Sequence, residues 1–132
     1  MINPHLDGIE HINIYSKAQT ELGRLLSNFA HTPFTGNGHT FQSVEGWWYW
    51  FRGGKTHHHL KSLYGYRAKQ EGRKYPAVKW ITPEILVQVY RAKLEAHPQI
   101  RVEYEKYTDL PFAHYYRYGE KIVVPKSAAW TA

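Results

Sequence analysis

HTFQSVEGWWYWFRGG, residues 39–54, is the stretch that decides the fold of this chain, because it predicts a central aromatic helix. Ser43 is a residue type that caps the start of a helix, and Gly53 and Gly54 are residue types that end one. We therefore expect a helix over residues 43–52, with aromatic side chains directed into a core.

The same helix carries a carboxylate among aromatic rings. Glu45 is followed closely by Trp47, Trp48, Tyr49 and Trp50. A carboxylate held against indole rings loses solvation, and a flat aromatic face stacks on a purine. Two interpretations follow. One is a base-binding pocket, and the other is a buried helix in which the acid stabilises the positive end of the helix dipole.

Length, cysteine content and charge limit the classes of protein to consider. The chain has 132 residues, which fits one domain, and no cysteine, which excludes disulfides and thiolate chemistry. Across residues 52–79, eight Lys or Arg residues face one acid, Glu71, so this segment carries +7 and the rest of the chain −1. The asymmetry favours a phosphate-bearing partner, although a solvated basic face gives the same pattern.

The sequence gives no sign of membrane targeting. Its start, MINPHLDGIEHINIY, lacks a basic leader followed by an apolar stretch, and no run approaches the length that crosses a bilayer. We expect a soluble, cytoplasmic protein with no membrane partner. A compact form would suit a virus-encoded protein, which would then act in the host cytoplasm.

Two further helices are indicated. HLKSLYGYRAKQEGR, residues 59–73, places apolar residues near one face and ends at Gly72. TPEILVQVYRAKLEAHP, residues 82–98, starts with Thr82 as a natural cap and Pro83 at the first helical position. We expect most of this second helix to be scaffold.

Short strands are expected around these helices. Alternating apolar residues predict a strand over residues 9–15, and residues 25–41 are expected to be irregular or to carry short strands. HYYRYGEKIVVP, residues 114–125, predicts a hairpin that turns at Gly119, whereas residues 100–108 fit a helix or a strand. The fold class is therefore α+β, a mostly helical single domain with short strands and a C-terminal β-hairpin.

Several short motifs follow one another in a characteristic order. They are INIYS, LLSNF, SVEGWW, AKQEGR, a Trp before the long helix, and VYRAKLEAHP, and they lie within a resemblance that covers about residues 11–118. The most specific part is the spacing from SNF at 27–29 to SVE at 43–45 and GR at 72–73. This order resembles that of the NADAR family, also called YbiA-like N-glycosidases, and the chain is similar to a compact, divergent member.

The resemblance implies a fold, an activity and site residues. It implies one YbiA-like domain over residues 1–132 and hydrolysis of N-glycosidic bonds, either in riboflavin-pathway ribosylamino intermediates or in ADP-ribose attached to guanine. By its place in the motifs, Glu45 matches the family's catalytic glutamate. Asn28, Phe29 and Arg73 match positions expected around the nucleotide.

One position departs from the family pattern. Family members commonly carry a lysine, proposed to capture the sugar as a Schiff base, where this chain has Arg52. A guanidinium cannot form that adduct. Lys55 lies three residues further on and is our second candidate catalytic residue.

The remaining site residues are predicted from the chemistry. Cleavage of a C–N bond at an anomeric carbon passes through an oxocarbenium-like state, so we expect Glu45 to stabilise the cation and to orient or deprotonate water. We expect Trp48 or Trp80 to stack on the base. Arg73 or Lys69 is expected to pair with phosphate oxygens.

Histidines enter the prediction in two places. Adjacent residues in a helix point about a third of a turn apart, so His57, His58 and His59 are not expected to converge on one metal ion. We predict no metal and no cofactor. His114 is a candidate for acid–base help at the substrate, because its reference pKa lies near neutrality.

Three functions stay open on the sequence alone. The first is a hydrolase that acts on a nucleotide, on an ADP-ribosyl small molecule or on ADP-ribosylated nucleic acid. The second is a module that binds ADP-ribose or another nucleotide without turnover. The third is a basic protein that binds single-stranded nucleic acid by stacking aromatic residues on exposed bases.

Overall fold

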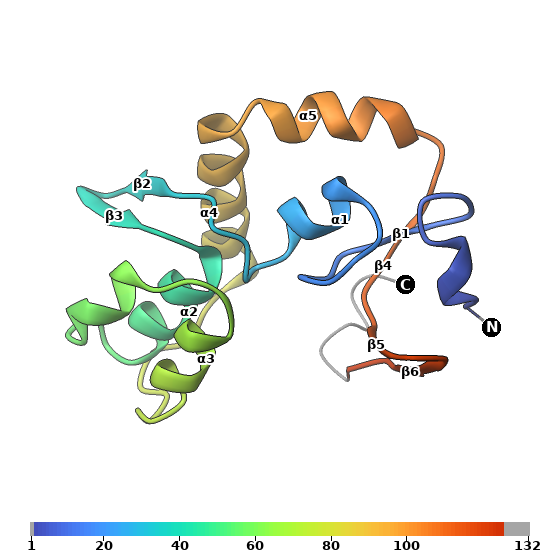
Figure 1. The fold of residues 1–132 in the computed structure, drawn as a ribbon. Helices are drawn as coiled ribbons and strands as arrows, with labels where there is room; N and C mark the ends of the chain where they lie inside the picture. The colour runs from blue at the N-terminus through green and yellow to red at the C-terminus, as the bar shows by residue number, and fades with distance from the viewer. Residues whose placement is uncertain (1, 126–132) are drawn as a thin grey trace. The chain divides into compact units, whose positions relative to one another are not determined.

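The computed structural model describes residues 2–125 and shows an α+β chain, as the sequence predicts. Five α-helices, three short 3₁₀ helices and three two-stranded sheets are present in this range (Figure 1). The chain divides into two compact units. The central unit runs from Asn28 to Pro98, and the terminal unit combines the chain up to Ser27 with the chain from Gln99 onward. No helix in residues 2–125 is long and apolar enough to cross a membrane.

The central unit begins with a β-hairpin and continues with helices. Asn37 (φ 52°) and Gly38 (φ 83°) make the turn of the hairpin, since Asn–Gly is suited to two left-handed residues in succession. The elements of the unit are β2 (Phe34–Gly36), β3 (His39–Phe41), α2 (Val44–Arg52), the 3₁₀ helix η2 (His58–Ser62), α3 (Gly65–Gly72) and α4 (Pro83–Ala96).

Helices α2 and α4 begin where the sequence predicts. The Ser43 hydroxyl accepts a hydrogen bond from the Gly46 N–H at 3.0 Å and donates to the Leu63 carbonyl at 2.9 Å. The Thr82 hydroxyl accepts from the Ile85 N–H at 3.3 Å, with Pro83 in the first turn of α4. Both predicted N-caps are therefore confirmed.

The predicted helix over residues 59–73 is wrong as one continuous element. It is broken into η2 and α3 because Leu63 and Tyr64 are extended and Gly65 has a φ of +65°. The Gly65 N–H donates to the Phe29 carbonyl at 2.9 Å, so the break attaches the start of α3 to a distant segment.

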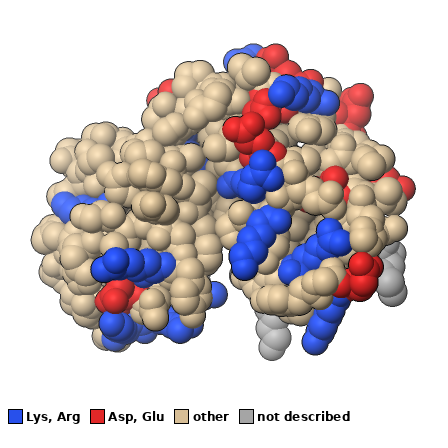
Figure 2. Space-filling view, viewed as in Figure 1, with Lys and Arg blue, Asp and Glu red and all other residues tan. Residues whose placement is uncertain are grey.

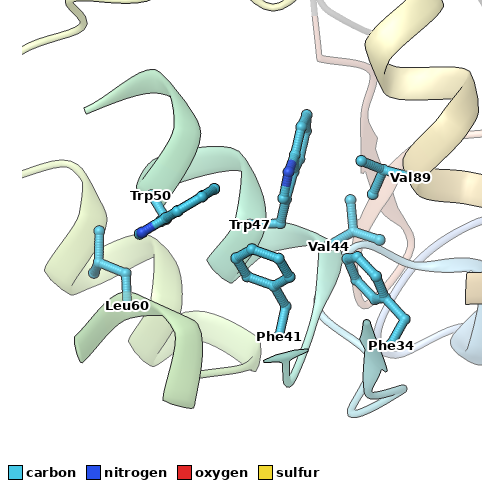
Figure 3. Close-up of a cluster of buried hydrophobic side chains, with 7 residues drawn as sticks. All are labelled: Phe34, Phe41, Val44, Trp47, Trp50, Leu60 and Val89. Atoms are coloured by element: carbon cyan, nitrogen blue, oxygen red, sulfur yellow. The ribbon is translucent and has the colours of Figure 1, made fainter. Parts of the chain in front are cut away.

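The core of the central unit lies on one side of α2. It is formed by residues from β2, β3, α2, η2 and α4, whose side chains converge in Figure 3: Phe34, Phe41, Val44, Trp47, Trp50, Leu60 and Val89. Trp47 and Trp50 are only 5% and 4% exposed. Two of the four aromatics beside Glu45 are therefore core residues, and their burial supplies much of the hydrophobic stabilisation of this unit.

Small residues bring α3 against α2. A Cβ atom built on Gly72 would lie 2.2 Å from Cγ of Tyr49, and one on Gly46 would lie 2.6 Å from the Leu60 carbonyl oxygen. Ala68 of α3 is completely buried. Only glycine fits at 46 and 72. Gly72 brings the end of α3 against Tyr49 of α2, and Gly46 brings the start of α2 against the backbone at Leu60 and Leu63.

The terminal unit has a smaller core of Ile12, Leu22 and Ile100. The expected strand over residues 9–15 is reduced to two residues, Ile12 and Asn13, which pair in parallel with β4. The elements of the unit are η1 (Pro4–Leu6), β1 (Ile12–Asn13), α1 (Glu21–Leu26), α5 (Gln99–Tyr104), η3 (Glu105–Tyr107), β4 (Phe112–Ala113), β5 (Tyr116–Tyr118) and β6 (Lys121–Val123).

Three features of this unit answer the sequence predictions. Helix α1 was not predicted, although Thr20 caps it by accepting a hydrogen bond from the Gly23 N–H at 2.9 Å. Residues 100–108, left open between helix and strand, are helical in α5 and η3. The C-terminal hairpin is confirmed in β5 and β6, with Gly119 at a φ of 62° in its turn.

Candidate active site

The candidate site of the central unit is built around the segment Asn28–Phe29. The Glu45 N–H donates to the Asn28 carbonyl at 3.0 Å, and the Gly65 N–H donates to the Phe29 carbonyl at 2.9 Å. The starts of α2 and α3 are thus attached to adjacent residues of one loop. The motifs SNF and SVE, which lie 16 residues apart in the sequence, meet here.

Glu45 lies in the first turn of α2 and is half-buried. Burial raises the pKa of its carboxyl from 4.5 to about 7, and the positive charge of Lys69 opposes that rise. Within residues 2–125, no side chain donates a hydrogen bond to this carboxylate. An acid that served only to stabilise the helix dipole would have its pKa lowered by the helix terminus. Burial therefore dominates the pKa of Glu45, as the functional interpretation of this residue requires.

A second pair of polar groups lies beside this carboxyl. The Tyr90 hydroxyl of α4 donates a hydrogen bond to Oδ1 of Asn28 at 3.1 Å. Burial raises the pKa of Tyr90, the bond to Asn28 opposes the rise, and the negative charge of Glu45 adds to it. Tyr90 and Glu45 are therefore within electrostatic reach, and Tyr90 fixes the Asn28 side chain with its amide NH₂ still able to donate.

Lys69 brings a positive charge to the same site. It lies on α3, half-buried, and its charge acts on Glu45. The placement depends on the close packing of α3 on α2 at Gly72 and Ala68. Asn28, Glu45 and Lys69, which the sequence assigned to the site, are thus brought together from three separate segments.

The aromatic residues of α2 divide between two faces of the helix. Trp48 and Tyr49 follow Glu45 by three and four residues, so they share its face. Trp47 and Trp50 follow it by two and five residues, which at about 100° per residue places them on the far side. The four aromatics therefore do not all surround Glu45. Trp48 shares the helix face of Glu45 and also packs against the core of the central unit.

The structure does not bring Lys55 together with Glu45 at one cleft. Lys55 lines a separate cleft together with Trp47, Trp50 and Phe51, on the face of α2 opposite Glu45. Its Nζ lies 4.9 Å from the centre of the Phe51 ring. The two glycines before Lys55 end the helix and direct the chain away from the Glu45 face.

Arg73 and Trp80 lie on the exposed surface of the central unit. Arg73 is the C-terminal cap residue of α3, and its guanidinium donates to the Tyr66 hydroxyl at 3.3 Å. Trp80 is 83% exposed, so it is not a core residue. Neither side chain has a described contact with Glu45.

The histidines are occupied by separate contacts. His114 belongs to the terminal unit, where its Nδ1 bonds to the Ile14 carbonyl, and the assignment of His114 to the Glu45 site has no support. His57 stacks on Tyr75 at 3.6 Å between ring centres, and His58 Nδ1 accepts from the Trp50 indole N–H at 3.4 Å. Residues 2–125 contain no group of three metal-binding side chains.

Tyr90 is the site residue that the sequence did not assign. It lies in the helix over residues 82–98, most of which we expected to be scaffold, and its partner Asn28 is 62 residues away. The available signal was its hydroxyl, because a tyrosine in a buried stripe requires a hydrogen-bond partner.

Comparison of the chain with protein-family models, with curated proteins and with solved structures finds no match. The function is therefore inferred from the residues of the site. The site contains the half-buried carboxyl of Glu45, whose pKa is about 7, the Asn28 amide fixed by the Tyr90 phenol, and the Lys69 ammonium group. The Trp48 indole lies on the same face of α2 as Glu45. This set is suited to stabilise a developing positive charge while binding a polar, phosphorylated ligand.

Proposed function

We propose that the chain is a YbiA-like N-glycosidase that hydrolyses the N-glycosidic bond of an ADP-ribosylated or phosphoribosylated nucleobase. The observation that carries the proposal is the half-buried Glu45, with its pKa raised to about 7, beside Asn28, Lys69 and Tyr90. All four of these residues lie in motifs that resemble the NADAR family.

Glu45 performs the central chemistry in this proposal. As the C–N bond to the base lengthens, positive charge develops at the anomeric carbon and its ring oxygen. A carboxylate in a poorly solvated position stabilises that charge more strongly than one in water. The same group accepts a proton from the attacking water, which a pKa near the working pH favours.

The neighbouring residues bind and orient the substrate. The Asn28 amide, fixed by Tyr90, donates to sugar hydroxyls, and Lys69 pairs with phosphate oxygens. Trp48, on the same face of α2 as Glu45, stacks on the departing base with Phe29 nearby. This arrangement keeps the proposed roles of Asn28, Phe29, Trp48 and Lys69.

Lys69 also replaces Lys55 as the lysine to test for covalent capture of the sugar. The charge of Lys69 acts on Glu45, whereas Lys55 lines a cleft on the opposite side of α2. Lys69→Arg keeps the positive charge and removes the nucleophilic amine. If Lys69 only binds phosphate, Lys69→Arg retains most of the activity, and Lys69→Ala loses about tenfold to a hundredfold.

The test is release of the free base. The protein is incubated with ADP-ribosyl-guanosine and with a ribosylaminouracil phosphate, and products are separated by chromatography. We expect release from one of them, with Glu45→Gln reducing the rate about 10²–10³-fold. Glu84→Gln is the matched control, because Glu84 also lies in the first turn of a helix and is exposed. Release that is unchanged in Glu45→Gln removes Glu45 as the catalyst.

The rate should also follow the ionisation of Glu45. If the carboxylate is the active form, kcat/KM rises with pH through about 7 and reaches a plateau above it. A rate that falls across the same range means that the protonated acid is the active form. Glu45 would then protonate the leaving base rather than stabilise the cation.

Exposed aromatic and basic groups favour nucleic-acid binding as the second candidate function. Tyr66 and Trp80 are 56% and 83% exposed, and the Arg73 guanidinium lies 5.8 Å from the Tyr66 ring centre. Figure 2 shows basic side chains over the α2 and α3 region, and others elsewhere on this face. Exposed rings beside cations suit single-stranded nucleic acid.

A binding assay separates this candidate from the enzyme. Binding of an oligonucleotide that weakens steeply with salt and is lost in Trp80→Ala, with no base release, supports the nucleic-acid protein. Binding of ADP-ribose that is lost in Lys69→Ala, again with no product, supports a nucleotide-binding module without turnover.

A further inference from the structure

A second cleft lies in the central unit on the far side of α2 from Glu45. It has a volume of about 390 Å³ and lies between α2, the β2–β3 hairpin and α4. Clefts that hold small molecules are typically about 300–1,000 Å³, so this one is suited to a ligand with a single ring system. Its walls include five aromatic residues: Phe34, Phe41, Trp47, Trp50 and Phe51.

The polar groups of the cleft are donors and amides. Lys55 lines it, together with the amide side chains of Asn37 and Gln88, and no carboxylate is among the residues that line it. An ammonium without a carboxylate partner favours an anionic group on the ligand. The two amides offer both donors and acceptors, which match the edge of a nucleobase.

His39 adds a further donor. Its Nδ1 accepts a hydrogen bond from the Lys61 ammonium at 3.1 Å, so its ring hydrogen is on Nε2. Partial burial, followed by the charges of Lys61, His58 and Lys55, lowers the pKa of His39 and so favours its neutral form. The cleft therefore has a fixed N–H donor within a group of positive charges.

The backbone places Lys55 at this cleft in an uncommon conformation. Lys55 has a φ of 64°, after Gly54 at 100°, and its N–H donates to the Trp50 carbonyl at 2.9 Å. A residue with a Cβ rarely adopts a positive φ, and glycine adopts it readily. Replacing Lys55 by glycine therefore removes the side chain without disturbing the turn.

We propose that this cleft binds a nucleoside monophosphate, with the base against the aromatic walls and the phosphate at Lys55 and His39. The site is independent of the Glu45 site and of the activity proposed for it, since the two occupy opposite faces of α2. In this proposal Lys55 binds the phosphate of a ligand in the cleft and takes no part in the chemistry at Glu45.

Calorimetric titration tests the proposal. Adenosine 5′-monophosphate, adenosine and inorganic phosphate are each titrated into the full chain and into Lys55→Gly. We expect saturable binding of the monophosphate and binding of adenosine about tenfold or more weakly. Lys55→Gly should weaken binding of the monophosphate by about tenfold or more, because its phosphate contacts Lys55. The affinity for adenosine, which has no phosphate, should be unchanged.

Two control variants locate the binding. Lys79→Ala removes an exposed lysine of the same basic segment and Glu45→Gln alters the other face of α2, so both should bind the monophosphate as the wild type does. Binding should also quench tryptophan fluorescence. This is measured in the Trp80→Phe variant, which lacks the exposed indole. The proposal is overturned if the wild type gives no saturable binding. It is equally overturned if Lys55→Gly binds normally or if Glu45→Gln abolishes binding.

Discussion

The two faces of α2 present opposite charges to a ligand. One face carries a half-buried carboxylate, Glu45, close to Lys69 and closed by the packing of α3. The other carries mostly buried aromatic rings that line a cleft together with Lys55 and His39, and no carboxylate lines that cleft. A carboxylate suits a developing cation, and cations suit a bound anion. One nine-residue helix thus offers two different chemistries, and the neighbours of each face decide which one it supports.

The largest effect should come from breaking the contact that forms the Glu45 face. Gly72→Ala forces a Cβ against the Tyr49 ring, and we expect a loss of about 2–3 kcal/mol in the free energy of unfolding. Gly36→Ala is the matched control, because a Cβ there has nothing within 4 Å. Urea denaturation compares the two variants. Equal stabilities would contradict the packing of α3 on Tyr49.

The second prediction concerns the cost of ionising Glu45. Its pKa is raised in the folded state, so its contribution to stability is full below pH 4.5 and is lost as pH rises through about 7. Glu45→Gln does not titrate and should therefore be more stable than wild type by about 2 kcal/mol at pH 9, after discounting for partial exposure. The two proteins should be equally stable at pH 4.

Stability measured against pH for both proteins tests this prediction. Gain of stability with loss of base release would mark Glu45 as a residue kept for function rather than for folding. A variant that is less stable than wild type at pH 9 would support the structural interpretation, in which Glu45 stabilises the start of α2.

Sequence patterns identified the helices and turns of the chain better than they identified which side chains share a face of α2. The caps at Ser43 and Thr82 and the turn at Gly119 are local features, and all three were predicted. Helix α1 was missed because its six residues are too few to show a helical repeat. The pattern over residues 59–73 did not show the break at Gly65, which depends on the distant Phe29 carbonyl.

The site was predicted in part, for a related reason. Motif order pointed to Asn28 and Glu45, and charge pointed to Lys69. Lys55 was assigned to the wrong face because closeness in sequence does not give the direction of the chain after two glycines. Tyr90 was missed because only the tertiary structure brings its hydroxyl to Asn28.

A smaller loss of activity and stability is expected from changing Tyr90, which orients the Asn28 side chain beside Glu45. Tyr90→Phe removes the hydroxyl that fixes Asn28, and we expect a loss of about tenfold in kcat/KM and about 1 kcal/mol in stability. Tyr118→Phe, at an exposed tyrosine of the hairpin, should change neither quantity. A Tyr90→Phe protein with wild-type kinetics would remove Asn28 orientation from the mechanism.

The proposed chemistry requires Glu45 to be a poorly solvated carboxyl that titrates near neutrality. Carbon-13 NMR of the side-chain carboxyls between pH 3 and 9 measures this directly, and the Glu45→Gln variant identifies the resonance. The account predicts a pKa of about 7 for Glu45. A value at or below 4.5 would show a solvated or dipole-stabilised acid and would contradict the account.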